Sequence, residues 1–114
     1  MDSAVEILKI LKNVVSVIGN HRNTPLNRTS YITVVGTLKT AAENIQRLNP
    51  STTHIQEYLL EIQRHILNNT FSSYTELKVQ IQRYLPERIK MDLDITQDTV
   101  RESLVDFANV LVKL

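Results

Sequence analysis

The chain has 114 residues, enough for one hydrophobic core and too few for a second independent one. It contains no cysteine, which excludes disulfide scaffolds and thiolate zinc sites, and its formal net charge of +1 provides no global attraction to nucleic acid or anionic lipid. With 2 glycines and 3 prolines, it also lacks the turn residues of a many-stranded β fold. We therefore expect one all-α domain over residues 1–114, a compact bundle of about five helices in which sequential helices are antiparallel neighbours.

The first helix is expected to begin at Ser3 and to end at Gly19-Asn20. Ser3 and Glu6 have the spacing of a capping box, in which the two side chains satisfy free amides of the first turn. The apolar positions follow the helical period and cover about half of the circumference, which is wide for a helix with one neighbour. They are Ala4, Ile7, Leu8, Leu11, Val14, Val15 and Ile18, widened by Ile10 and Val17.

The second helix is expected over residues 28–48, with Asn49-Pro50 as its end. One side is apolar and the opposite side is polar, so this helix should be half buried. Gly36 lies inside it and lowers local helix stability by about 1 kcal/mol relative to alanine. This glycine indicates either a close helix crossing or nothing at all.

The third helix should run to about Asn68, and the three hydroxyl residues at 51–53 offer alternative N-caps for it. Its inward stripe consists of Ile55, Tyr58, Leu59, Ile62 and Ile66. Leu60 and Leu67 fall outside that stripe. Because these two leucines are seven residues apart, they form a second stripe that needs a further neighbour or a partner.

A second capping-box pattern, Ser73 with Glu76, is expected to open a shorter fourth helix that Pro86 closes. Tyr84 belongs to its inward stripe, together with Leu77, Ile81 and Leu85. Over residues 86–95 we expect a helical turn followed by an extended link.

The fifth helix should be capped by Thr96 and continue to the end of the chain. Its inner face is formed by Val100, Leu104, Phe107, Ala108, Leu111 and Leu114. Val105 and Val112, again seven residues apart, extend that face sideways. This helix, like the first, therefore has more apolar surface than one contact would use.

Side chains that could carry chemistry are few. His54 and His65 share a face of the third helix, but about 16 Å of helical rise separates them, too far for one metal ion. Glu61 and His65 are four residues apart and are expected to form a surface pair. We therefore predict no catalytic site, no metal site and no cofactor.

The extra apolar stripes favour a non-catalytic interaction or assembly module over an enzyme. The expected interface residues are Leu60, Leu67, Val105 and Val112, and the partner is a protein, with a second copy of the chain as one candidate. The competing interpretation is that the first and fifth helices lie centrally and bury their stripes inside the core.

Two local clusters of basic residues give the alternative, an accessory domain that binds RNA or DNA. Arg83, Arg88 and Lys90 flank the Pro86 turn, and Arg22 and Arg28 flank the Pro25 turn beside His21. Solvated loop charges explain the same residues, because the total charge is balanced. A small helical enzyme is the third possibility.

The apolar N-terminal stretch, residues 4–18, is interrupted by Glu6, Lys9 and Lys12 and is too short to span a bilayer. No small-residue cleavage site follows it, so it does not have the form of a secretory signal. We expect no membrane insertion and a location in the cytoplasm or nucleus. The many Asn, Thr and Ile residues are typical of an AT-rich genome, such as that of a virus or a low-GC microbe.

Overall fold

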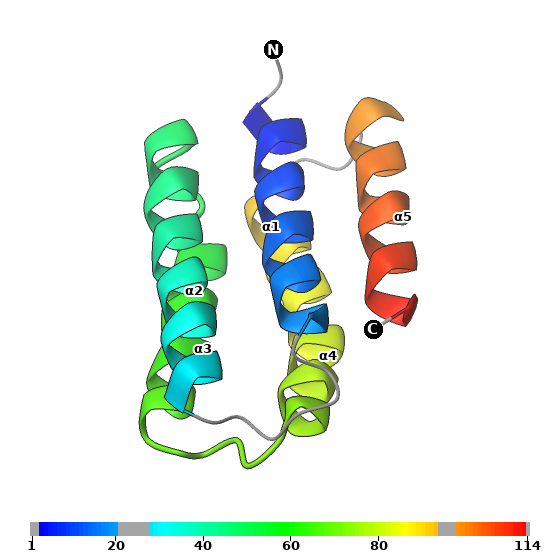
Figure 1. Ribbon diagram of the computed structural model, residues 1–114. Helices are drawn as coiled ribbons and strands as arrows, with labels where there is room; N and C mark the ends of the chain where they lie inside the picture. The colour runs from blue at the N-terminus through cyan, green and yellow to red at the C-terminus, as the bar shows by residue number, and fades with distance from the viewer. Residues whose placement is uncertain (1–2, 21–27, 94–97, 114) are drawn as a thin grey trace.

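The computed structural model describes residues 3–20, 28–93 and 98–113 and folds them into five helices without a strand (Figure 1). The helices are α1 (Ser3–Gly19), α2 (Arg28–Leu48), α3 (Thr53–Leu67), α4 (Tyr74–Asp92) and α5 (Asp98–Lys113). The predicted all-α bundle is thereby confirmed, and the bounds of the first three helices agree with the prediction within one or two residues.

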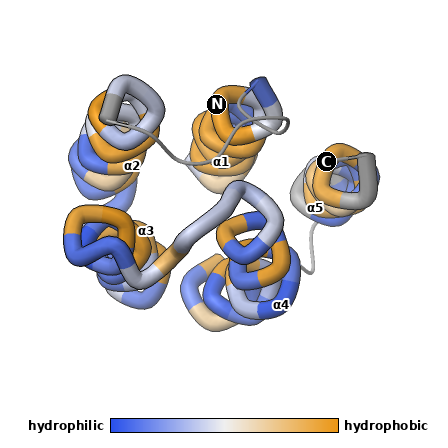
Figure 2. The backbone as a smooth tube through the Cα atoms, turned by 60° about the horizontal axis from the view of Figure 1, so that its bottom comes forward, coloured by the Kyte–Doolittle hydropathy of each residue, from blue (hydrophilic) through white to orange (hydrophobic). Residues whose placement is uncertain are grey.

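Each helix runs antiparallel to the one before it, and α1 to α4 pack in chain order, α1 on α2, α2 on α3 and α3 on α4 (Figures 1 and 2). The last helix departs from this order. Helix α5 packs mainly against α1, to which it runs parallel, and only lightly against α4. A helix from one end of the chain therefore lies beside a helix from the other end.

The wide apolar face of α1 is explained by this arrangement. All seven residues of its predicted stripe are buried, and Ile10, which widens the stripe, packs half-buried against the core. Helix α1 needs this width because it contacts α2 on one side and α5 on the other. For the first helix, the competing interpretation therefore holds, and its stripe belongs to the core.

The surroundings of Gly36 in α2 show whether this glycine marks a close helix crossing. No atom outside the local helix backbone lies within 4 Å of the position that a Cβ would take at this glycine. A close helix crossing is therefore not its reason.

The predicted end of the fourth helix at Pro86 is wrong, because α4 continues through Pro86 to Asp92. A proline inside a helix costs about 3 kcal/mol, since it cannot donate to the carbonyl four residues earlier. Beyond it, however, Ile89 and Leu93 are buried, and each such side chain contributes about 1.5–3 kcal/mol. Burial of these two residues offsets the loss at Pro86 and keeps the chain helical.

The predicted start of this helix is confirmed. The Ser73 side chain accepts a hydrogen bond from the Glu76 backbone N–H at 3.3 Å. The Glu76 carboxylate reaches one residue further back than a simple capping box requires, and it accepts from the Ser72 N–H at 3.0 Å and the Ser72 hydroxyl at 2.7 Å. The predicted cap of the fifth helix, Thr96, lies outside the described residues.

Candidate site in the groove between α3 and α4

A groove of about 270 Å³ runs between α3 and α4 and combines aromatic rings with charged side chains. Its walls are formed by Tyr58, Glu61, Ile62, His65, Thr70, Phe71, Gln80, Tyr84 and Arg88. Residues from two helices and from the segment that joins them meet here, because α3 and α4 pack antiparallel along their lengths.

Tyr58 lies at one end of the groove and contacts three residues of α4. Its hydroxyl donates a hydrogen bond to the Gln80 backbone oxygen at 2.8 Å, and its ring contacts the Tyr84 ring edge-to-face, with centroids 6.4 Å apart. The Arg88 guanidinium lies over the Tyr58 ring, 5.7 Å from its centroid, which is the geometry of a cation–π contact. Burial raises the pKa of Tyr58 well above its ordinary value, and the nearby Glu61 charge adds to the shift, so the phenol stays neutral.

His65 and Phe71 form the other end, with ring centroids 5.5 Å apart. His65 Nε2 also lies 3.6 Å from the Glu61 carboxylate, so the surface pair predicted from their spacing is present. Within the described ranges, no three His, Asp or Glu side chains are placed so that they could hold a metal ion.

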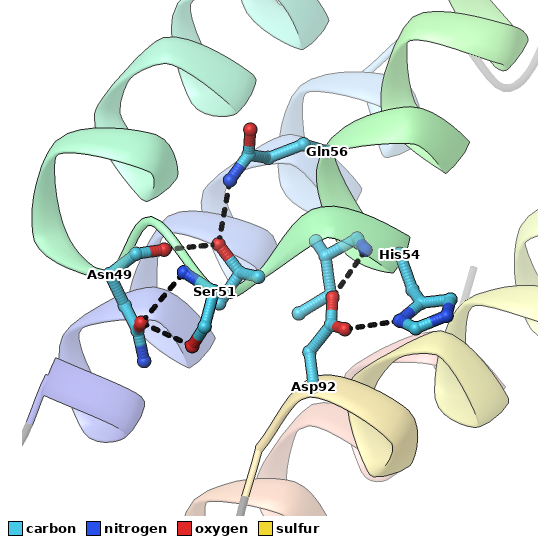
Figure 3. A network of polar contacts seen from close by, with 7 residues as sticks. Asn49, Ser51, His54, Gln56 and Asp92 are labelled. Atoms are coloured by element: carbon cyan, nitrogen blue, oxygen red, sulfur yellow. Dashed lines mark hydrogen bonds and ion pairs between the residues drawn. The ribbon is translucent and has the colours of Figure 1, made fainter.

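An acidic side chain connects the end of α4 to the start of α3 (Figure 3). One oxygen of Asp92, at the end of α4, accepts from the Ile55 backbone N–H, and the other lies next to His54 Nδ1, both at 2.6 Å. The Asp92 side chain is only 1% exposed. Because Ile55 lies in the first turn of α3, Asp92 acts as the N-terminal cap of a helix that is 37 residues away in sequence.

The hydroxyl residues that were expected to cap α3 have other partners. Thr52 occupies the N-cap position, but its side chain makes no capping hydrogen bond. It donates to the Asn49 backbone oxygen at 2.6 Å and accepts from the Gln56 side chain at 2.9 Å. The predicted N-cap position is therefore confirmed at Thr52, but the side-chain bond expected of it is absent. Sequence inspection missed Asp92 because it has no local signal.

The four predicted interface residues do not form one surface. Leu60 and Leu67 are 46% and 60% exposed on α3, and Val105 is 55% exposed on α5. These two helices lie at opposite sides of the bundle (Figure 2). The Val112 side chain lies outside what the structure describes. The competing interpretation was that the fifth helix buries its whole apolar stripe in the core. The exposure of Val105 shows that this interpretation is wrong for that residue.

The basic residues of α4 are divided between two faces. Arg83 and Lys90 are exposed, and their seven-residue spacing places them on the same outer side of the helix. Arg88 is half-buried and lines the groove toward α3. Tyr84, which was expected to point inward, is 37% exposed and also lines the groove. Of the second cluster, Arg22 and the Arg28 side chain lie outside the described residues.

No described helix is long and apolar enough to cross a membrane. Comparison of the chain with protein-family models, with curated proteins and with solved structures finds no match.

Proposed function

We propose that this chain is a non-catalytic interaction module that binds a protein through the outer face of α3. The observation that supports the proposal is the exposure of Leu60 and Leu67. Seven residues are almost two helical turns, so the two leucines lie about 10 Å apart on one side of the helix. Single exposed leucines are ordinary on a protein surface, whereas an aligned pair is typical of a contact face.

The partner that we propose first is a second copy of the chain. Leu60 lies in a shallow hollow that is also lined by Glu57, Glu61 and Arg64. If two copies of α3 pair antiparallel about a two-fold axis midway between Leu60 and Leu67, Leu60 of one copy faces Leu67 of the other, and the reverse. This face is therefore complementary to its own copy through its two leucines, and it carries both acidic and basic side chains, Glu57, Glu61 and Arg64, beside them.

Light scattering over a concentration series tests this proposal at low and high salt. We expect a dimer that persists at high salt, because apolar contacts between the leucines are not screened by salt. The double variant Leu60→Asp, Leu67→Asp should be a monomer with an unchanged circular dichroism spectrum. Val105→Asp is the control, since it places an aspartate at a comparably exposed apolar position on α5.

Each alternative result has a defined meaning. If Val105→Asp dissociates the dimer and the α3 double variant does not, the interface lies on α5. A wild-type monomer at the highest soluble concentration would contradict self-association. The outer face of α3 would then be the place to test for a different protein.

Nucleic-acid binding by α4 is the second candidate, and the exposed pair Arg83 and Lys90 favours it. Glu87 is exposed between them and Arg88 faces α3, so two phosphate contacts are the most that this face offers. Fluorescence anisotropy with a labelled oligonucleotide at low salt is the test. Affinity that falls with salt and is lost in Arg83→Gln, Lys90→Gln supports the candidate, and a flat binding curve removes it.

A further inference from the structure

Arg88 is the cation of the groove between α3 and α4, and its charge is not matched by an acid. The residue is half-buried, and its guanidinium carbon lies 5.7 Å from the centroid of the Tyr58 ring. Among the residues that the structure describes, no carboxylate lies within ion-pair distance of it. Contact with a ring face leaves the edge of a guanidinium free, and that edge carries five N–H donors in a planar fork. Arg88 therefore presents donors to a groove that contains no matching anion beside them.

The surroundings of Arg88 define the kind of anion that would fit. The Tyr58 hydroxyl already donates to the Gln80 backbone oxygen, so that ring is fixed in place. Beyond it, Tyr84, Ile62 and Phe71 supply aromatic and aliphatic walls. A ligand that places a negative group on Arg88 would thus bring whatever is attached to it against apolar surface.

The charge and size of the groove favour a carboxylate over a phosphate as the anionic group of the ligand. Its lining holds one arginine and one acid, Glu61, so a phosphate dianion would gain one cation and be repelled by one carboxylate. A carboxylate is a monoanion and matches a single guanidinium in a two-bonded geometry. The volume of about 270 Å³ lies just below the range of about 300–1,000 Å³ that is usual for drug-sized ligands.

We propose that this groove binds a carboxylate attached to an aromatic body, with Arg88 pairing with the carboxylate and the Tyr84 ring contacting the body. Two sources have this chemistry, a free aromatic acid and a peptide segment in which an acidic residue adjoins an aromatic one. The groove shares Glu61 with the hollow beside Leu60 but is lined by neither Leu60 nor Leu67. The proposal therefore does not depend on self-association.

The test is a titration followed by two-dimensional NMR, with signals of the Arg88 Nε–H and the Tyr84 ring as reporters. Phenylacetate represents the free acid, the blocked dipeptide N-acetyl-Asp-Phe-amide represents the peptide, and phenylacetamide is the neutral control. For a probe of this size we expect a Kd on the order of 1–10 mM. Phenylacetamide should bind at least about tenfold more weakly, because a hydrogen bond to a charged group is lost.

Variants separate the role of Arg88 from a merely structural one. Arg88→Met keeps the apolar stem over Tyr58 and should weaken phenylacetate about tenfold or more, whereas Arg88→Lys should recover part of the affinity. Arg83→Met removes the same charge from the exposed face of the same helix and should change nothing. Glu61→Gln should tighten binding a few-fold, because it removes the nearby negative charge.

The outcomes are distinguishable. Tighter binding of phenylacetate than of the dipeptide assigns the site to free acids, and the reverse order assigns it to a peptide. The proposal is overturned if neither probe shifts the reporters up to about 50 mM, far above the expected Kd. It is equally overturned if phenylacetamide binds as well as phenylacetate, or if Arg88→Met binds like the wild type. The α3 double variant should bind both probes unchanged.

Discussion

Replacement of Asp92 by alanine is the sharpest test of how α3 and α4 are held together. The Asp92 side chain is almost fully buried and accepts two short hydrogen bonds, one from the Ile55 backbone and one from His54. Its removal leaves the Ile55 amide in the first turn of α3 without its partner. The start of α3 also loses a negative charge that suits the positive end of the helix dipole.

The magnitude follows from the two bonds. A hydrogen bond to a charged group contributes about 1.5–3 kcal/mol, and the buried bond to Ile55 should reach this range. The bond to His54 counts for less, since that ring is half-exposed and water can replace Asp92 there. We expect Asp92→Ala to lower the free energy of unfolding by about 3 kcal/mol. Asp92→Asn keeps one acceptor oxygen and should lose about half of that.

Urea unfolding followed by circular dichroism measures the global effect, and hydrogen exchange of the Ile55 amide measures the local one. Asp106→Ala is the matched control, because Asp106 is an exposed acid whose ion pair with Lys12 spans 3.7 Å. That control should change stability by less than about 0.5 kcal/mol. The reasoning is refuted if Asp92→Ala changes stability as little as the control while the Ile55 amide remains as protected as in the wild type.

Three further predictions concern other parts of the bundle. Gly36→Ala should stabilise the protein by about 0.5–1 kcal/mol in a thermal melt, because the methyl group meets nothing within 4 Å and helix propensity improves; a lower Tm would contradict this. Phe107→Ala should cost about 3–5 kcal/mol in urea unfolding, since this fully buried ring anchors α5; a loss below about 1 kcal/mol would mean that α5 is held otherwise. Hydrogen bonds from Ser72 lower the pKa of Glu76 below its ordinary 4.5, so its stabilisation of the start of α4 is present above that pH and is lost as the pH falls through the lowered pKa. The Ser72 amide signal should follow this titration in NMR, and an amide shift unchanged across it, or retained in Glu76→Gln, would disprove the assignment.

Much of the fold could be predicted from residues close together in sequence. The stripes of α1 and α3 are buried as predicted, because the helical period alone determines which side chains share a face. The Ser73 cap was predictable for the same reason, since both of its partners lie within one turn. Pro86 shows the limit of local rules, because the burial of Ile89 and Leu93 beyond it depends on what α4 packs against.

The candidate site could be predicted only in part. The spacing of Glu61 and His65 predicted their contact, and Arg88 was recognised as one of a basic group. The sequence could not predict that Arg88 lies over Tyr58, apart from the other basic residues of α4. The two residues are brought together by the packing of α4 against α3. Leu60 and Leu67 were correctly placed outside the main stripe of α3, but the sequence does not say which neighbour, if any, covers them.

The sequence by itself determined the helical class, most helix bounds and the inward stripes, since propensity, capping and periodicity act within a few residues. The tertiary structure alone decided that α5 packs on α1, that Asp92 caps α3 and that Arg88 faces the groove. Each of these depends on contacts between residues that are 30 or more positions apart, such as the 37 that separate Ile55 from Asp92. Such contacts form only when the helices pack together. Burial of their apolar faces in one shared core determines which helices become neighbours.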